Sequence, residues 1–172
     1  MTAPASAAWP PAPIATERLV LRASEARDRP MFVALFSSEE VGAHKGGARP
    51  RAELEEAMPE VPGQRPGFFV VTAEDEMIGA VTLDRREDGS TELGYLFLPR
   101  VWGRGYAIEA CAAALGWCAD ERPGEPVVVT IRTANTRSLR LAARLGFTEV
   151  KRFEEWGAEQ WRGELSRQAP AG

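Results

Sequence analysis

Hydrophobic and polar residues alternate in several short stretches of the chain, which is the pattern of strands with one buried face. Residues 17–23 alternate in this way and predict a short, half-buried strand. Farther along, three stretches rich in β-branched and aromatic residues follow one another with only short polar turns between them, which predicts an antiparallel meander. These stretches are residues 67–73, 77–83 and 91–98.

Helical spacing of the apolar residues appears in four other segments. The first begins at Ser24, which we expect to cap it, and the second is the acidic segment 50–58. The third, residues 106–121, consists of strong helix formers. The fourth, residues 138–145, ends before Gly146, which stands in the position of a helix C-cap.

The remaining segments complete an α/β order. An unbroken apolar run at residues 127–132 predicts a strand that is covered on both faces. Two polar segments near the C-terminus, 151–156 and 160–166, are expected to be closing strands, and the glycine-rich residues 41–48 are expected to form a loop between the first two helices. Strands, helices and the central meander together indicate a mostly antiparallel sheet with helices on it.

The composition places the chain among soluble proteins. It has 172 residues, of which 44% are hydrophobic and 27% charged, and a formal net charge of -4, which is typical of one globular domain. The acidic balance argues against nucleic-acid binding as the main role, and no uncharged apolar run is long enough to span a membrane. The N-terminal segment has four prolines and no basic start, so we expect no signal peptide and a cytoplasmic location.

The ends of the chain and its cysteines set further limits. Residues 1–15 and 168–172 are rich in alanine, proline and glycine and are expected to be disordered tails around one domain at 16–167. Cys111 and Cys118 fall about 10 Å apart on a predicted helix, which is too far for a disulfide. With a single histidine in the chain, we expect no metal site.

The stretch from Leu96 to Ala110 carries the strongest chemical signal. A predicted strand leads into Gly103, Arg104 and Gly105, and a predicted helix starts at once. Backbone N–H groups and the helix dipole therefore converge on one point, which indicates an anion site rather than a plain turn. A dinucleotide fingerprint would need glycine where Ile108 stands, and the lysine and hydroxyl of a triphosphate loop are absent.

A second signal lies in residues 133–147, where a strand ends and a helix follows. Asn135 stands between these two elements, and basic residues gather around them. A solvated helix face explains such residues plainly, but beside the glycine turn they favour a polyphosphate ligand such as coenzyme A. The basic residues are Arg132, Arg137, Arg140, Arg144, Lys151 and Arg152.

The combination of these segments resembles the GNAT acetyltransferases, and most closely the Rim-like branch that acetylates ribosomal-protein N-termini. The segments are TERLVLR, ELGYLFLPRVWGRGYAIEA and, about thirty residues later, NTRSLRLAARLGF, so the resemblance covers residues 16–166. A register of the family signature that starts at Arg100 is rejected, because proline normally stands three residues before the signature, as Pro99 does here. The signature, Q/R-x-x-G-x-G/A, then falls on Trp102, Gly103, Arg104, Gly105, Tyr106 and Ala107, with tryptophan in the first position as is usual in the Rim-like branch.

The resemblance implies the GNAT fold and acetyl-CoA as co-substrate, without a metal. The fold is α/β, with a mixed, mostly antiparallel sheet of about six or seven strands, about four helices, and a splayed strand pair that holds acetyl-CoA. Backbone groups of the splayed strand would line the pantetheine arm, and the amides of the signature would hold the pyrophosphate. The cofactor-binding residues implied in this way are Phe97, Leu98, Gly103, Arg104, Gly105, Tyr106, Ala107, Asn135 and Arg140.

The resemblance also offers catalytic residues. Acetyl transfer needs a base for the amine proton and an acid for the departing thiolate. Glu92 matches the base of the histone-acetylating branch, although a surface carboxylate is the plain alternative, and Glu154 lies where a ribosomal-protein acetylating relative has its base. The usual tyrosine acid of the superfamily falls on Ala142, so Ser138 is the candidate acid, unless it only caps its helix.

The acceptor stays open at this stage. The acidic segment 50–58 favours a cationic amine or is simply solvated, and His44 lies in a loop over the expected acceptor cleft. We expect direct acetyl transfer from acetyl-CoA to an amine, preferably the N-terminal amine of a protein or peptide. The alternatives are a small amine (an aminoglycoside, polyamine or amino acid) and a CoA-binding GNAT module without turnover. The expected partner is the amine acceptor, with no nucleic acid and no membrane, and the chain is expected to be a monomer or homodimer.

Overall fold

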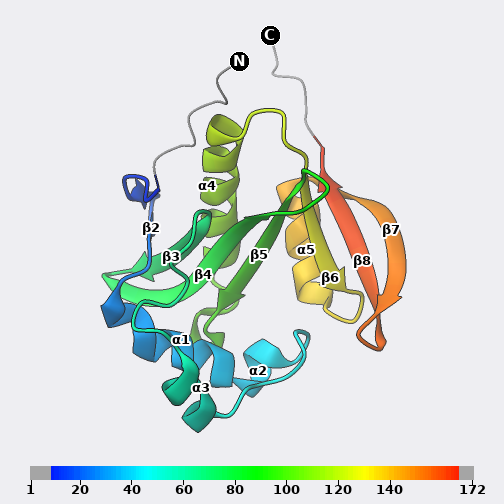
Figure 1. Ribbon diagram of the computed structural model, residues 1–172. Helices are drawn as coiled ribbons and strands as arrows, with labels where there is room; N and C mark the ends of the chain where they lie inside the picture. Colours follow the sequence, from blue (N-terminus) through cyan, green and yellow to red (C-terminus); the bar gives the residue numbers. More distant parts are fainter. Residues whose placement is uncertain (1–8, 167–172) are drawn as a thin grey trace.

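The structure is a computed structural model that describes residues 9–166, so the expected tail at 168–172 and the first eight residues of the other expected tail lie outside the described residues. Its sheet has eight strands in the order β1-β2-β3-β4-β5-β6-β8-β7 (Figure 1). The strands are β1 (Ile14–Ala15), β2 (Val20–Arg22), β3 (Phe68–Ala73), β4 (Glu76–Arg85), β5 (Thr91–Phe97), β6 (Val127–Arg132), β7 (Phe147–Glu155) and β8 (Ala158–Leu165). The helices are α1 (Arg29–Ser37), α2 (Glu39–Gly42), α3 (Arg51–Ala57), α4 (Tyr106–Glu121) and α5 (Thr136–Leu145), with short 3₁₀ turns at Ala26–Asp28 and Pro99–Val101.

The two central strands β5 and β6 are hydrogen-bonded over only part of their length. All neighbouring strands are antiparallel except β5 and β6, which are parallel. β4 and β5 pair at seven positions, whereas β5 and β6 pair at two, Thr91 opposite Val127 and Glu92 opposite Val128. Beyond these pairs β5 and β6 diverge (Figure 1), so their carboxyl ends lie apart.

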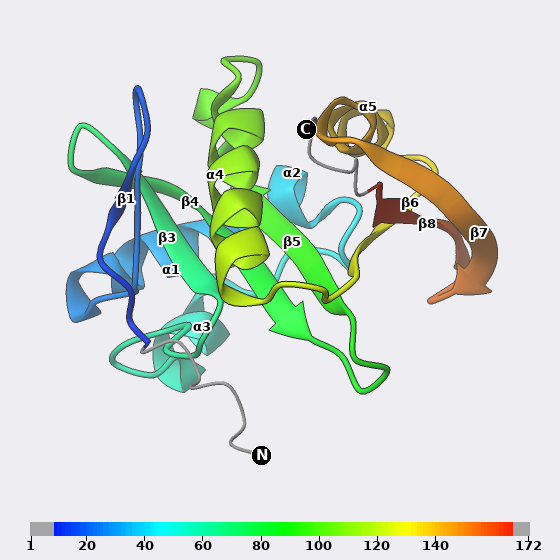
Figure 2. The same cartoon turned by 90° about the horizontal axis from the view of Figure 1, so that it is seen from above.

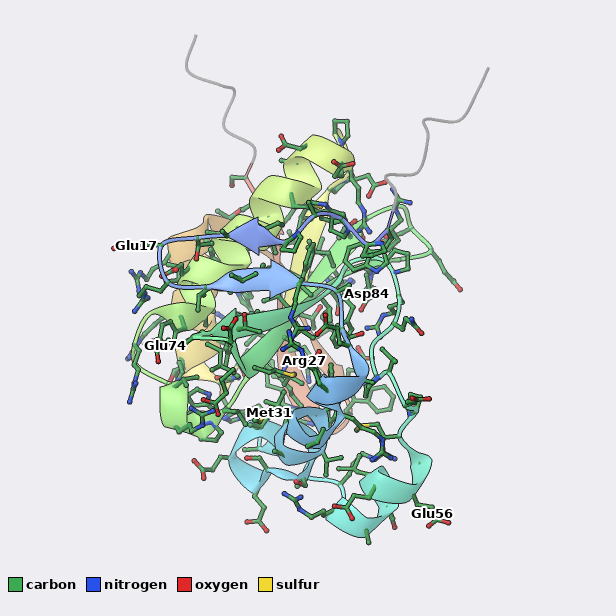
Figure 3. The ribbon with its side chains drawn as sticks, turned by 90° about the vertical axis from the view of Figure 1, so that its left-hand side faces the viewer. Glu17, Arg27, Met31, Glu56, Glu74 and Asp84 are labelled. Atoms are coloured by element: carbon green, nitrogen blue, oxygen red, sulfur yellow. The ribbon has the colours of Figure 1, made fainter. Side chains whose placement is uncertain are left out.

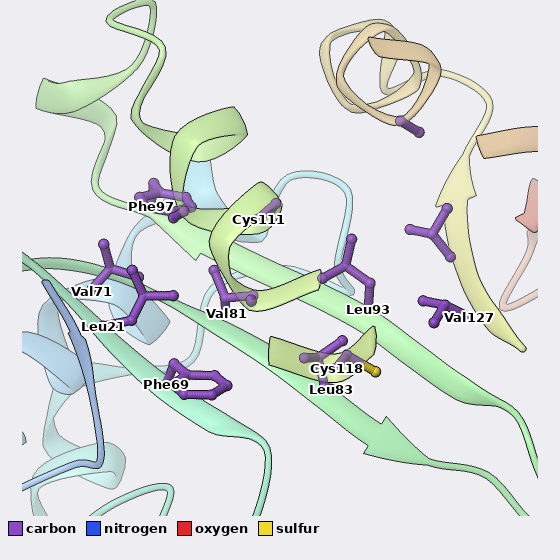
Figure 4. Close-up of a cluster of buried hydrophobic side chains, with 14 of the residues drawn as sticks. Leu21, Phe69, Val71, Val81, Leu83, Leu93, Phe97, Cys111, Cys118 and Val127 are labelled. Carbon is purple, nitrogen blue, oxygen red and sulfur yellow. The ribbon is translucent and has the colours of Figure 1, made fainter. Parts of the chain in front are cut away.

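Helices cover both faces of the sheet (Figure 2). On one face, α4 and α5 pack over the main core, where Leu93 and Phe97 of β5 lie with Cys111 and Cys118 of α4 in one cluster (Figure 4). On the other face, α1 and α2 pack over a second cluster that includes Phe32. Both cysteines are buried, and they do not form a disulfide with each other.

Two elements keep their predicted bounds, α4 at residues 106–121 and β6 at 127–132. Gly105 precedes α4 in the left-handed region, with φ at 78°, and Pro123 follows its end. Local signals of this kind act on the neighbouring backbone directly, which is why they locate these ends well.

The first long helix begins later than expected. The hydroxyl of Ser24 is buried and has no hydrogen-bond partner in the described part of the chain, so Ser24 is not the cap that we predicted. Instead, the carboxylate of Asp28 accepts the N–H of Glu25 at 2.8 Å and forms two hydrogen bonds with the guanidinium of Arg22, at 2.7 and 2.8 Å. Asp28 is 3% exposed, and α1 begins at the next residue.

The N-terminal tail was expected to extend to residue 15, and this boundary is wrong. Ile14 and Ala15 pair with β2. Trp9 packs edge-on against Phe69 and Trp117, with ring centroids 5.2 and 5.8 Å away. The high proline content predicted a tail, but these apolar side chains bind residues 9–15 to the core.

Further differences concern length and number. β7 begins at residue 147 and β8 at residue 158, both earlier than the predicted closing strands, because the two strands pair along almost their whole length. β1 and the short helix α2, which lies partly in the predicted loop 41–48, bring the described chain to eight strands and five helices. The mixed, mostly antiparallel sheet with helices on both faces is confirmed.

Candidate active site

A cleft of about 740 Å³ opens where β5 and β6 have diverged. Its walls come from the turn before α4, the start of α5 and the loop after α2, and both long helices begin at this end of the sheet (Figure 1). Of the residues predicted from the sequence, eight line the cleft: Phe97, Gly103, Gly105, Tyr106, Ala107, Asn135, Ser138 and Arg140. Four of the predicted residues are not part of the lining: Glu92, Leu98, Arg104 and Glu154.

The turn before α4 presents free backbone donors to the cleft. Gly103 and Gly105 have φ values of 80° and 78°, a conformation that strongly favours glycine. The N–H of Glu109 donates to the carbonyl of Gly105 at 3.2 Å, one helical turn earlier. The N–H groups of residues 106–108 precede this bond and therefore have no partner inside the helix. They and the positive end of the α4 dipole make the turn an anion cradle.

The N-terminal segment holds this cradle from outside. The carboxylate of Glu109 accepts the hydroxyl of Thr16 at 2.6 Å, and it accepts the backbone and side chain of Arg18 at 3.0 and 2.7 Å. The same guanidinium donates to the carbonyl of Arg104 at 2.9 Å and lies over the ring of Tyr106. Desolvation, the largest single effect, raises the pKa of Glu109, but these hydrogen bonds together outweigh it and lower the pKa. Arg104 therefore serves the cradle through its carbonyl.

The wall formed by α5 is basic. Arg137, Arg140 and Arg144 all line the cleft. Asn135 caps the helix, since its side-chain oxygen accepts the N–H of Ser138 at 3.2 Å. The alternative role of Ser138 as the cap is thus wrong, and its hydroxyl is not used at the helix end.

Trp102 connects the two walls. The guanidinium of Arg137 lies 4.0 Å from the centroid of its ring, in cation–π contact. The indole N–H donates to the carbonyl of Phe97 at 2.9 Å. One backbone acceptor at the end of β5 is therefore already used by the protein itself.

The backbone of β5 corrects one predicted contact. The N–H of Leu98 donates to the carbonyl of Ile78 on the β4 side at 2.9 Å, and the Leu98 side chain is buried in the second core cluster. Backbone groups along a strand alternate in direction, so Phe97 and Tyr95 direct theirs toward β6. Leu98 is therefore not placed to line a ligand, whereas Tyr95 is.

Tyr95 is a site residue that the sequence analysis missed. Its side chain lines the cleft, and its hydroxyl is buried without a hydrogen-bond partner among the described residues. Burial raises the pKa of Tyr95 to about 12, while the nearby Ser138 hydroxyl acts in the opposite direction. The sequence contained the signal for this residue. Tyr95 lies two residues before Phe97, so the side chains of both lie on the same face of the sheet.

The helix α2 and the loop after it supply the third wall, with Glu40 on the helix and His44 and Lys45 in the loop. The ammonium of Lys45 lies 5.9 Å from the centroid of the Tyr95 ring. Although the residue as a whole is exposed, burial of the ammonium lowers the pKa of Lys45, and the negative charge of Glu92 opposes this effect. Among the described residues that line the cleft, Glu40 alone carries a carboxylate.

Neither carboxylate predicted as the base belongs to the cleft. Glu92 forms an ion pair with Arg86 across the turn between β4 and β5. Glu154 is exposed on β7, opposite Glu159 of β8. The acidic side chains of α3 are also exposed, and Glu56 lies at the outer margin of the molecule (Figure 3), so that helix does not supply charge to the cleft lining.

The described residues contain neither a metal-binding cluster nor a helix that could span a membrane. Within residues 9–166, no group of three or more His, Cys, Asp or Glu side chains is arranged to hold a metal ion. No helix in that range has the length and hydropathy needed to cross a membrane.

Comparison with known proteins identifies the family. The family model of the acetyltransferase (GNAT) domain matches residues 18–148. The uncharacterized protein YkkB of Bacillus subtilis (strain 168) is 29% identical over 153 residues, which cover 83% of this chain and 89% of YkkB. Fold, cleft and family match together define an acetyltransferase. The chain belongs to the GNAT acetyltransferase family.

Solved structures share the fold. A GNAT-family acetyltransferase from Bacillus anthracis superposes with a TM-score of 0.75 at 20% identity, covering 89% of this chain and 97% of that one. Spermidine N-acetyltransferase from Vibrio cholerae, in complex with CoA and spermine, gives 0.71 at 19% identity, with 87% and 96% covered. RimL, a ribosomal L7/L12 α-N-protein acetyltransferase, gives 0.71 at 15% identity, with 87% and 90% covered. At these identities the likeness concerns the fold alone.

Proposed function

We propose that this protein transfers the acetyl group of acetyl-CoA directly to an amine, and that the acceptor is the N-terminal amine of a protein or peptide. The observation that carries the proposal is the cleft between two parallel strands, which ends at the free N–H groups of α4. The acetyltransferase domain matched at residues 18–148 includes most of the walls of this cleft and supports the same activity.

The donor fits the cleft by charge and by shape. Its pyrophosphate is proposed to lie on the amides of residues 103–107, where the helix dipole favours an anion. Arg140 and Arg144 of α5 add positive charge on the opposite wall. The pantetheine arm is proposed to pass between β5 and β6, where Tyr95 and Phe97 direct backbone groups that β6 does not pair.

The proposed chemistry is direct attack by a neutral amine. Its nitrogen attacks the thioester carbonyl carbon, the C–N bond forms, the C–S bond breaks, and the thiol leaves. Glu40, exposed at the cleft, is proposed to take the amine proton through water, because Glu92 is paired with Arg86 and Glu154 lies on the outer hairpin. Ser138 keeps its proposed place beside the leaving sulfur.

Charge at the acceptor end favours a peptide over a polyamine. Lys45 places a cation in the lining there, close to Tyr95, and Glu40 is its one carboxylate neighbour in the described lining. A polyamine carries several positive charges, which Lys45 would repel. A peptide N-terminus presents one amine that loses its proton near neutral pH, at a pKa of about 7.7–8.0. Both acceptor classes occur among proteins of this fold, in RimL and in the spermidine acetyltransferase.

The test uses two glycine substitutions that impose the same backbone strain. Gly105→Glu places a side chain and a negative charge in the cradle, at φ 78°. Gly89→Glu is the matched control: its φ is 86°, its side chain would meet open space, and it lies in the turn before β5, at the end opposite the cleft. Isothermal titration with acetyl-CoA should give at least a 100-fold weaker Kd for Gly105→Glu and a change below about twofold for Gly89→Glu. Equal affinity in both variants would refute the assignment of the cradle.

Acceptors are then compared by release of free thiol from acetyl-CoA. Short peptides with a free α-amine, their N-blocked counterparts, spermidine and an aminoglycoside form the panel. Release that requires a free peptide α-amine supports the proposal, whereas release with spermidine alone moves the acceptor to small amines. Tight binding with no release from any acceptor would instead favour a CoA-binding module without turnover.

A further inference from the structure

We propose that Tyr95 is a catalytic acid of this site, which donates its phenolic proton to the sulfur of the departing thiolate. The inference rests on the proposed acetyl transfer and adds a residue to it. Sequence reasoning had found no tyrosine for this task, because Ala142 stands at the expected position. The structure supplies one from the opposite side of the cleft, on β5.

The Tyr95 hydroxyl is buried in an unusual state. Nearly every buried hydroxyl in a folded protein has a hydrogen-bond partner, since an unpartnered one destabilises the fold. The ring of Tyr95 packs against the main core, yet its hydroxyl forms no hydrogen bond of good geometry among the described residues, and the Ser138 hydroxyl is the polar side chain that acts on it. Because the side chain also lines the cleft, a ligand in that cleft is positioned to be the missing partner.

Tyr95 is also well positioned for this role. Tyr95 lies on β5 beyond the two positions that pair with β6. It is therefore next to the gap through which the thioester arm is proposed to pass. Ser138 of α5 lies close enough to affect its pKa, and both side chains line the same cleft. A sulfur held between β5 and the start of α5 would therefore meet two hydroxyl groups, one from each wall.

The Tyr95 hydroxyl is protonated at neutral pH, as a proton donor must be. With its pKa raised to about 12, the Tyr95 hydroxyl carries its proton throughout the neutral range and can act as a donor. Three groups face it: Lys45 from the loop after α2, Cys111 from α4 and Ser138 from α5. Cys111 is buried outside the lining and burial raises the pKa of its thiol, so it is not a competing acid. A negative charge that develops on the nearby sulfur favours loss of the phenolic proton to it.

The proton balance of the step is complete. When the C–S bond breaks, its electron pair stays on sulfur, and the Tyr95 proton forms the S–H bond. The phenolate then regains a proton from solvent by way of the Ser138 hydroxyl. The amine gives up one proton to the base, so the net products are the acetylated amine and free thiol.

The test begins with Tyr95→Phe, which removes one buried oxygen atom that forms no hydrogen bond of good geometry within residues 9–166. The thermal midpoint of the variant should be equal to or above that of the wild type, and its Kd for acetyl-CoA should stay within threefold. Its kcat in the thiol-release assay should fall about 100-fold, the usual size of a general-acid contribution. Ser138→Ala should lose less, about tenfold, because solvent can replace a relay group.

A second measurement separates proton donation from packing. Incorporation of 3,5-difluorotyrosine at position 95 alone keeps the hydroxyl and lowers its pKa. If Tyr95 donates the proton, the alkaline limb of the kcat profile moves to lower pH, whereas a packing role leaves the profile where it was. The Lys45→Met variant, measured in parallel, shows whether any shift belongs to the lysine instead.

Each outcome has one meaning. Full turnover by Tyr95→Phe, or a loss explained by weaker acetyl-CoA binding, overturns the role of Tyr95 while the proposed function stands. Absence of thiol release by the wild-type protein, with every acceptor in the panel, is a failure of the proposed function, and the assignment of Tyr95 fails with it. A loss of turnover with unchanged binding, unchanged stability and a shifted pH profile supports the assignment.

Discussion

Two ion pairs with the same geometry are expected to contribute very different amounts to the free energy of unfolding. Arg22 with Asp28 and Arg65 with Asp84 are both two-bond pairs, with N–O distances of 2.7–2.8 Å and 2.9–3.0 Å. They differ in burial: the carboxylate side chain is 4% exposed in the first pair and 45% in the second. Removal of one partner of a buried pair leaves an uncompensated charge and costs about 3–5 kcal/mol, whereas an exposed pair contributes about 0.2–1 kcal/mol.

Asp28→Asn should therefore lower the free energy of unfolding by about 3 kcal/mol, near the low end of the range, because the amide oxygen can still accept the N–H of Glu25. Asp84→Asn, the matched control, should cost less than about 1 kcal/mol. Urea unfolding at pH 7 measures both, and equal m-values would confirm that the compared states are alike. Since Asp28 is not part of the cleft lining, affinity for CoA should not change.

The pH dependence gives the same prediction a second check. Desolvation, the largest single effect, raises the pKa of Asp28, but the hydrogen bonds from Arg22 and from the N–H of Glu25 outweigh it and lower the pKa below its ordinary value of 3.8. A lowered carboxyl pKa gives stability that is present above the unfolded-state pKa and is lost as pH falls through the folded-state pKa. The gap between wild type and Asp28→Asn should thus shrink below about pH 4. A cost no greater than that of Asp84→Asn, or a gap that widens in acid, would refute the reasoning.

Two further predictions concern the cleft. Glu109→Gln should weaken CoA binding about fivefold, or about 1 kcal/mol, because Arg18 then holds the cradle less firmly. Titration calorimetry measures the Kd of this variant and of the control Glu121→Gln, which lies at the far end of α4. Equal Kd values for the two variants would contradict the prediction. Lys45, whose pKa is lowered by burial of its ammonium, should react with acetic anhydride at lower pH than an ordinary lysine and be protected by CoA. The chain has one other lysine, Lys151 on β7, which serves as an internal reference in peptide mass spectrometry; labelling of Lys45 that ignores CoA would place its amine outside the site.

The sequence predicted best where the signal and the structure lie on the same few residues. The glycines before α4 set its start through their own backbone angles, and Gly146 ends α5 in the left-handed region with φ at 99°. The same is true of the cradle, because the unpaired N–H groups follow directly from where α4 begins. No distant residue has to be known for any of these predictions.

The sequence was less informative where an ion pair between neighbouring elements determines the local structure. Ser24 has the composition of a cap, but Asp28 is drawn into a pair with Arg22 of the preceding strand, and the helix starts after it. The catalytic role of Glu92 stays a prediction, but its carboxylate pairs with Arg86 across the turn and lies outside the cleft lining. Neither event leaves a trace in the periodicity of the chain.

Lys45 and Tyr95 show the same limit within the site. Lys45 lies in a glycine-rich loop that has no periodicity, so only the packing of α2 against the sheet brings its amine to the cleft. Tyr95 was part of a correctly predicted strand, and the alternation along that strand gives its face. What alternation does not give is the absence of a partner for its hydroxyl, which depends on the position of α5.

The two residue pairs that join β5 to β6 make the stability of the sheet depend on a ligand bound between these strands. The segment from β6 to β8 is one continuous stretch of chain. Within residues 9–166, its strands pair with the other strands of the sheet only at Thr91 and Glu92 of β5. Acetyl-CoA, bound as proposed with its pyrophosphate at α4 and with α5 beside it, would lie across this seam and contact both parts of the sheet. A ligand that binds only the folded protein stabilises it by RT ln(1 + [L]/Kd), so acetyl-CoA bound across this seam as proposed should raise the free energy of unfolding with its concentration.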